Sequence, residues 1–210
     1  MTPALSRGAL PLLAAILVAG PMAAQQTDPR LERLEAAIRP AVAALVDSAR
    51  AAMLPTEPLV QRALEGATKH ASGDVIVAAV RRLAVDLAHA RDALGSTASP
   101  AELTAGAAAL RAGASPTILA QLRQTRREPV TMPLAVLADL VASGVPVDSA
   151  AAAVLALAAR ARDADLVEFR RAVERDIALG APPAVATAAA ATLSSVQVNA
   201  GARQQRPGRP

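Results

Sequence analysis

The segment Leu140–Pro146, with the sequence LVASGVP, ends one amphipathic helical pattern on a glycine and begins the next at a proline. Two related segments are Leu110–Pro116 (LRAGASP) and Ile177–Pro183 (IALGAPP). Glycine readily adopts the left-handed conformation that often follows the last turn of a helix, and proline is favoured where a helix begins. The predicted turn residues are Gly113, Gly144, Pro146 and Gly180. The chain is therefore predicted to consist of helices joined by tight turns.

The spacing of these turns predicts a helical repeat. The three glycines lie 31 and 36 residues apart (144 − 113 and 180 − 144), the size of a two-helix solenoid unit. Less regular copies of the turn are expected at Met53–Pro55 and His70–Ser72. No segment has the alternating pattern of a strand, and the copies do not match tetratricopeptide or ankyrin repeats. We expect an all-α fold, an irregular array of short antiparallel helical hairpins that is either α-solenoid-like or a helical bundle.

Capping patterns set the expected limits of the helices. Asp28 and Ser115, each followed by a proline, are predicted N-caps, because a short polar side chain accepts hydrogen bonds from the first turn. Ser99–Glu102 and Asp165–Glu168 match the capping-box pattern. The predicted cap residues are Asp28, Ser99, Glu102, Ser115, Asp165 and Glu168. The expected helices cover residues 28–52, 56–68, 73–94, 99–112, 115–127, 131–143, 146–160, 165–179 and 182–195.

The N-terminal residues have the three-part pattern of a secretory signal peptide. Arg7 precedes the apolar run Ala9–Ala19, and Gly20–Pro21 then interrupts the helix. Small residues precede a polar segment, so cleavage is expected after Ala24, or after Ala23 as the alternative. The run is shorter than the roughly 20 residues of a transmembrane helix. We therefore expect a protein that is exported to the periplasm or the cell exterior, with a retained N-terminal anchor as the weaker alternative.

These patterns divide the chain into three parts. Residues 1–24 are the expected signal peptide, residues 25–195 the helical-hairpin domain, and residues 196–210 a disordered basic tail. Hydrophobic residues make up 53% of the chain, which is typical of a folded domain. The chain contains no cysteine, so packing and helix caps stabilise the fold without disulfide bonds.

Three segments rich in small and aliphatic residues carry a resemblance. They are Leu64–His70 (LEGATKH), Val80–Leu83 (VRRL) and Asp139–Pro146 (DLVASGVP). Together they resemble a group of uncharacterised, exported, Ala-rich helical-hairpin proteins of GC-rich bacteria. The resemblance implies a helical protein outside the cytoplasm. It implies no activity, cofactor or site residue, because none is known for that group.

Residue types that catalyse reactions or bind metals are sparse. Without cysteine, only His70 and His89 are available as partners for a nucleophile. Asp86 and Asp92 lie three residues on either side of His89, a spacing that suits either a His–carboxylate couple or simple pairing on a solvated helix face. The chain has no metal-ligand cluster, phosphate-binding loop or dinucleotide fingerprint. We therefore predict no enzymatic activity, cofactor or metal.

The basic character of the chain does not indicate a nucleic-acid partner. The formal net charge is only +4, and acidic residues stand near the arginine pairs, among them Arg126–Arg127. Arginines in the last turn of a helix, as predicted for Arg126 and Arg127, are explained by the helix dipole. Phe169 is the only aromatic residue, whereas single-stranded nucleic acids are bound by several stacking side chains.

Three functions stay open from the sequence. The first is a non-catalytic scaffold that binds an envelope protein, or a second copy of itself, through the groove of a hairpin array. The second is an envelope-associated enzyme with a cryptic site built on Asp or Glu residues or on His89, with Asp86 as the candidate acid beside His89. The third is weak contact with the envelope surface through the basic tail and the uncharged segment between Asp176 and Arg203. That segment is predicted either as a buried closing helix or as a docking surface.

Overall fold

The computed structural model describes residues 28–204, so the expected signal peptide and residues 205–210 lie outside the described part. The elements are the 3₁₀ helix η1 (Pro29–Arg33) and the helices α1 (Arg39–Ala51), α2 (Glu57–Thr68), α3 (Gly73–Leu94), α4 (Pro100–Arg111), α5 (Pro116–Thr125), α6 (Thr131–Ala142), α7 (Val147–Ala158), α8 (Asp163–Ala178) and α9 (Pro183–Gln204). The all-α prediction is confirmed, because residues 28–204 contain no strand. Within this range, no helix combines the length and apolar character needed to cross a membrane.

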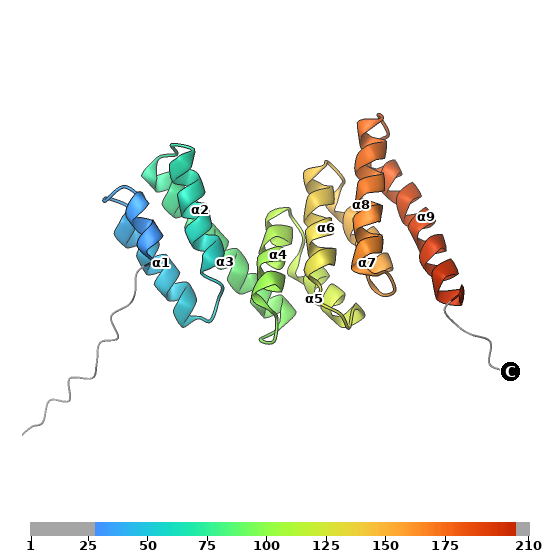
Figure 1. Ribbon diagram of the computed structural model, residues 1–210, viewed down its shortest axis with the longest axis horizontal. Coiled ribbons are helices and arrows are strands. Elements are labelled where there is room, and N and C mark those ends of the chain that lie inside the picture. The colour runs from blue at the N-terminus through green and yellow to red at the C-terminus, as the bar shows by residue number, and fades with distance from the viewer. Residues whose placement is uncertain (1–27, 205–210) are drawn as a thin grey trace, which may run out of the picture.

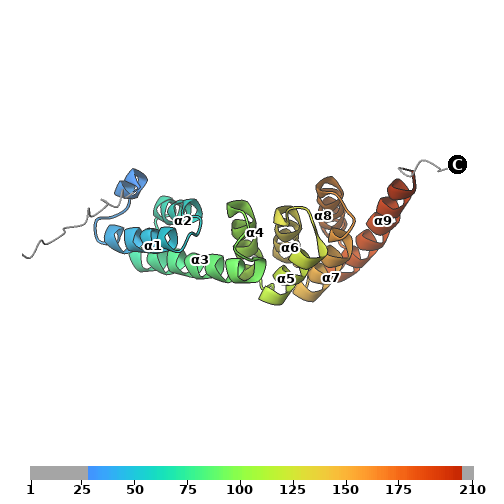
Figure 2. The same cartoon turned by 90° about the horizontal axis from the view of Figure 1, so that it is seen from below.

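The helices form an extended array of two layers (Figures 1 and 2). The helices α2, α4, α6 and α8 lie in one layer, while α1, α3, α5 and α7 lie in the other, with α9 at the far end. In the first layer α4 contacts α6 and α6 contacts α8, and in the second α3, α5, α7 and α9 contact one another in turn. Each hairpin therefore packs on the hairpins beside it, which makes the array α-solenoid-like.

Five of the turns between successive helices share one backbone geometry. Met53, His70, Gly113, Gly144 and Gly180 have φ values between 54° and 107°. At each of them, the N–H of the turn residue and the N–H of the next residue donate to carbonyls of the preceding helix over 2.9–3.0 Å. These two bonds define a Schellman motif. The upstream copies that lack glycine thus adopt the same turn, and Pro146 follows Gly144 closely as the N-cap of α7.

Replacing His70 with glycine is expected to stabilise the protein by about 1 kcal/mol. A residue with a β-carbon pays roughly 1–2 kcal/mol to adopt the left-handed conformation, and glycine avoids this cost. The flexibility of glycine offsets part of the gain. The φ of His70 is 54° and its side chain is exposed. Urea unfolding measures the change. Gly113→Ala is the opposite control, because φ is 107° there and the added Cβ would lie 3.3 Å from Cγ2 of Val147. Equal midpoints for both variants and the parent would contradict this account.

The first predicted helix is divided in the structure. The sequence predicts one helix over residues 28–52, but η1 ends at Arg33, Leu34 is extended (φ −81°, ψ 154°), and α1 begins at Arg39. Pro40 explains the division, because proline in a helix interior lacks the N–H donor and clashes with the preceding turn. It stands instead in the first turn of α1, where the missing donor costs nothing. Asp28 caps η1, with its carboxylate accepting from the N–H of Arg30 at 2.9 Å.

Two further boundaries differ from the prediction. The capping box predicted at Asp165–Glu168 is wrong, because α8 already begins at Asp163 and Glu168 is exposed inside the helix. Asp165 instead lies in the first turn of α8 and accepts a hydrogen bond from the N–H of Arg162 at 2.9 Å. The capping hydrogen bond therefore forms one turn earlier than the sequence predicts. The helix end predicted at 195 is also wrong, because α9 continues through residues 196–204 of the expected disordered tail. Residues 196–204 contain no proline, so no strong helix breaker stops α9 before its end at Gln204.

A continuous hydrophobic core lies between the two layers. Its largest fully buried side chains include Leu87, Leu119, Leu137 and Phe169. Small residues let the helices approach closely where the core contains few large ones. A Cβ added at Gly106 in α4 would lie 3.0 Å from the Cβ of Ala90 in α3. The alanine-rich composition therefore produces tight packing between the helices.

Candidate functional site

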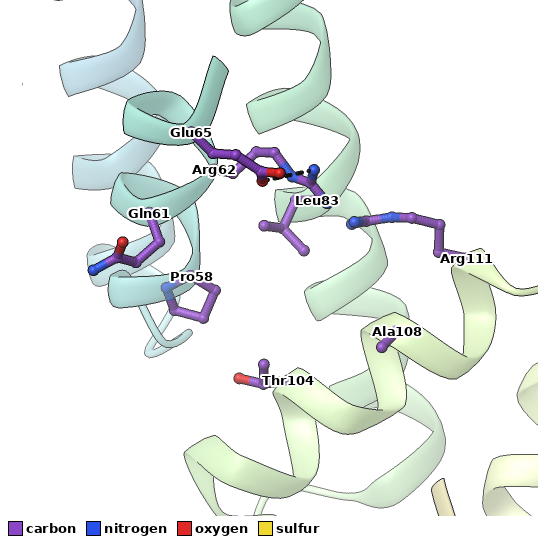
Figure 3. A pocket seen from close by; sticks show the side chains of 8 residues that line it. All are labelled: Pro58, Gln61, Arg62, Glu65, Leu83, Thr104, Ala108 and Arg111. Atoms are coloured by element: carbon purple, nitrogen blue, oxygen red, sulfur yellow. Dashed lines mark hydrogen bonds and ion pairs between the residues drawn. The ribbon is translucent and has the colours of Figure 1, made fainter. Parts of the chain in front are cut away.

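A groove opens in the first layer where α2 and α4 separate. Both helices pack on the 22-residue helix α3, but they meet mainly through it, whereas α4 and α6 contact each other directly. The space between them has a volume of about 460 Å³. Its lining residues are Pro58, Gln61, Arg62, Glu65, Leu83, Thr104, Ala108 and Arg111 (Figure 3). The length of α3 therefore creates a groove with two helical walls and a floor from the second layer.

The groove has an apolar floor and charged rims. Leu83 of α3 forms the floor, and Arg62 and Arg111 reach toward it from the opposite walls (Figure 3). Nη1 of Arg62 lies 3.1 Å from a carboxylate oxygen of Glu65, and Nη2 of Arg111 lies 3.3 Å from one of Asp86. Both arginine side chains are about one third exposed, so they keep free hydrogen-bonding positions toward the groove. The arrangement suits a ligand with an apolar centre and polar or acidic flanks.

The groove does not contain a recognisable set of catalytic groups. The hydroxyl of Thr104 donates to the carbonyl oxygen of Pro100 at 2.8 Å, so it faces its own helix. A hydrogen bond from Lys69 lowers the pKa of Glu65, which favours an ion-paired carboxylate rather than a general acid. Chemistry at neutral pH would need a base or acid with a pKa nearer to 7. The geometry fits binding better than catalysis.

The residues proposed for a cryptic acid–histidine site have other surroundings. The carboxylate of Asp86 pairs with Arg111 of α4, while His89 and Asp92 are exposed on α3. His70 is a turn residue with a positive φ. Among residues 28–204, no three His, Asp or Glu side chains gather as metal ligands do. The structure therefore brings Asp86 to the edge of the groove, but as a partner of Arg111.

Behind the groove, Glu102 connects the first turn of α4 to the segment before α6. Its carboxylate accepts hydrogen bonds from the N–H of Ser99 at 2.9 Å and from the N–H of Val130 at 3.0 Å, and it pairs with Arg123 of α5. The hydroxyl of Ser99 in turn accepts a hydrogen bond from the N–H of Glu102 at 3.2 Å. Glu102 is thus the acid of a capping box and also a buried link between three helices. Only the capping box follows from the sequence.

Burial alone would raise the pKa of Glu102. The hydrogen bonds from Ser99, Val130 and Arg123 outweigh that effect and hold the pKa below its ordinary value of 4.5. The side chain is only 7% exposed, so its ionised form depends on these donors rather than on water. Glu102 is therefore a charged structural residue at neutral pH.

Arg126 makes the corresponding link one hairpin further along. Its guanidinium donates to the carbonyl oxygens of Ala158 at 3.3 Å and Ala161 at 2.8 Å, at the end of α7. It also pairs with Glu128 at 2.8 Å and with Asp163 at 2.6 Å. The sequence predicts Arg126 only as a last-turn arginine that is explained by the helix dipole, and the structure shows in addition that its side chain is buried, with 3% exposed. The hydrogen bonds and ion pairs of Glu102, and then those of Arg126, thus hold together successive connections between the hairpins.

The remaining predicted cap at Ser115 has a local role, since its hydroxyl accepts from the N–H of Ile118 at 3.4 Å. Glu102, Arg123 and Arg126 thus support the array, while the groove between α2 and α4 is its candidate binding site. The groove could not be found from the sequence, since it depends on how α2 and α4 are placed along α3. In comparisons with known proteins, no family model, no curated protein and no solved structure matches this chain.

Proposed function

We propose that this protein is a non-catalytic helical scaffold that binds a polypeptide of the cell envelope in the groove between α2 and α4. The observation that carries the proposal is the groove itself, with Leu83 as its floor and Arg62 and Arg111 on opposite rims. Export to the envelope is part of the proposal and rests on the signal-peptide pattern of residues 1–24.

The dimensions of the groove support a short peptide segment as its ligand. Its walls, α2 and α4, are 12 residues each, or about 18 Å at the rise of an α-helix. A volume of about 460 Å³ accommodates a few side chains rather than a whole domain. Recognition of an amphipathic helix or loop by a helical groove uses this combination of an apolar floor and polar rims. We therefore expect a ligand segment with an aliphatic side chain over Leu83 and acidic or amide groups beside the arginines.

The proposal is tested by crosslinking from inside the groove in the producing cell. A photoreactive amino acid at Ala108, which is exposed on α4 and lines the groove, is expected to form one discrete adduct with an envelope protein. The matched control is the same amino acid at Ala156, exposed on α7 in the other layer. Equal adducts from both positions, or none from position 108, would refute the proposal.

A second change in the same chain separates groove binding from chance contact. Thr104→Arg places a long side chain in the groove from an exposed helix position, so the fold is expected to be retained while the adduct at position 108 is lost. Circular dichroism checks the fold, and the adduct yield is read on a denaturing gel. An undiminished adduct would show that the partner binds elsewhere.

A further inference from the structure

The two arginines of the groove between α2 and α4 converge on one apolar residue. Arg62 extends from α2 and Arg111 from α4, and both side chains reach toward Leu83 of α3 (Figure 3). The charged ends of the arginines are therefore near the apolar floor and not at opposite ends of the groove. A ligand that contacts both arginines and the floor must carry an acidic group and an apolar group close together.

The ion pairs around these arginines leave one positive charge in excess. Arg62 lies 3.1 Å from Glu65, and the same carboxylate accepts a hydrogen bond from Lys69 at 2.6 Å. Within residues 28–204, Arg111 pairs only with Asp86, at 3.3 Å. Three cationic side chains thus share two carboxylates. A guanidinium has five N–H donors, so both arginines keep donors for a further anion, and one carboxylate would balance the charge.

The groove is short along the direction of its walls. Its lining residues lie within residues 58–65 of α2 and 104–111 of α4, so each wall covers about 11 Å at the rise of an α-helix. An extended chain spans about 3.3–3.6 Å per residue, so the groove holds about three residues of a ligand. With so few residues in contact, charge-assisted hydrogen bonds to the arginines have to supply much of the affinity.

The C-terminal residue of a polypeptide combines the required groups. Its α-carboxylate and its side chain are attached to the same Cα, so both reach one place in the groove. An internal Asp or Glu brings a carboxylate, but the aliphatic side chain then belongs to another residue. In an extended segment, neighbouring side chains point to opposite faces, and in a helix the nearest side chains on one face have Cβ atoms about 5–6 Å apart.

From these observations we infer that the groove recognises the free C-terminus of a polypeptide whose last residue is aliphatic. The α-carboxylate binds between Arg62 and Arg111, and the last side chain packs on Leu83. Capture of a terminal carboxylate is one of the recurring modes of peptide recognition. This inference rests on the proposed binding of a polypeptide in the groove, and it specifies which part of that polypeptide is bound.

The first test locates the crosslink that the photoreactive amino acid at position 108 forms in the producing cell. After digestion, mass spectrometry is expected to find position 108 joined to the C-terminal peptide of the partner. A crosslink to an internal peptide would overturn the inference and leave the scaffold function standing. The absence of any adduct would instead refute the proposed function, so the two failures are distinguishable.

The second test compares three small probes by NMR titration of the purified full chain. N-acetyl-alanyl-leucine has a free carboxylate, and its C-terminal amide is the uncharged control. N-acetyl-glutamyl-leucine amide has an internal acid instead. The free carboxylate is expected to shift amide signals of α2 and α4, and both amidated probes are expected to bind at least about tenfold more weakly. Equal affinity for the three probes, or no binding of N-acetyl-alanyl-leucine, would overturn the inference.

Substitution of the arginines connects the affinity to the proposed contacts. Arg62→Gln and Arg111→Gln are each expected to weaken the binding of N-acetyl-alanyl-leucine at least about tenfold and to leave the weak binding of its amide unchanged. A purely structural role of the arginines would weaken both probes alike. Arg82→Gln is the matched control, because Arg82 is exposed on α3 beside Leu83 in sequence but does not line the groove. An equal loss in Arg82→Gln would indicate a general charge effect and overturn the inference.

Discussion

Replacing Arg126 with alanine is expected to lower the free energy of unfolding by about 3 kcal/mol, because the change removes a buried charge that satisfies several partners at once. The guanidinium donates to the carbonyl oxygens of Ala158 and Ala161 and pairs with Asp163 at 2.6 Å. The variant leaves both carbonyls without that donor and a cavity where the side chain was. Urea unfolding of the parent and the variant measures the difference.

Arg127→Ala is the matched control, because Arg127 is the next residue and is exposed. Its effect is expected to stay within about 0.5 kcal/mol, as for most surface substitutions. Hydrogen exchange adds a spatial test, since Arg126 joins α5 to the end of α7 and the start of α8. The amides of α7 and α8 are expected to exchange faster in Arg126→Ala, while those of α2 and α3 change little. Equal destabilisation by the two substitutions would mean that the buried contacts of Arg126 contribute nothing.

Replacing Glu102 with alanine is expected to cost a similar amount, about 3 kcal/mol. The loss combines a capping box, worth around 1 kcal/mol, with the hydrogen bond to Val130 and the pairing with Arg123. Thermal or urea unfolding measures the change. Glu168→Ala is the control, since Glu168 belongs to the same residue type but is exposed in the middle of α8. A loss in Glu168→Ala as large as that in Glu102→Ala would restore the predicted cap at Glu168 and contradict the role of Glu102.

The charge of Glu102 is also expected to make the stability of the protein depend on pH. Its pKa is lower in the folded protein than the ordinary 4.5, so folding favours the ionised carboxylate. This contribution is fully present above pH 4.5 and is lost as the pH falls through the folded pKa. Glu102→Gln is expected to be less stable than the parent at pH 7 and to lose less stability between neutral and acidic pH. Parallel stability curves for the two proteins would contradict the role of the charge.

Other carboxylates contribute to the same acid sensitivity, which is why the difference between the two curves matters more than either curve. Hydrogen bonds from Arg30 lower the pKa of Glu57 to about 2, and a hydrogen bond from Arg162 lowers that of Asp165. Glu57 is exposed, so solvent screens its ion pair and its effect on stability is small. Glu102→Gln leaves both residues unchanged and therefore isolates the buried group.

The helices and their turns follow largely from the sequence because the forces that make them are local. A Schellman turn needs a left-handed residue and two hydrogen bonds to the helix just before it, so Gly113, Gly144 and Gly180 mark their turns directly. Met53 and His70 show the limit of that pattern, because the same turn forms there without glycine. The predictions fail where two local signals compete, as at Pro40, which divides one predicted helix into η1 and α1.

By itself, the sequence determined that residues 28–204 form an array of helices joined by tight turns, since each signal lies within one helical turn of its effect. Only the tertiary structure decided which side chains are buried and which faces stay open. Besides their local partners, Glu102 and Arg126 have partners between 21 and 37 residues away, and no local pattern specifies such contacts. The groove between α2 and α4 likewise depends on where neighbouring helices begin and end. It is set by packing across the array, which a one-dimensional pattern does not encode.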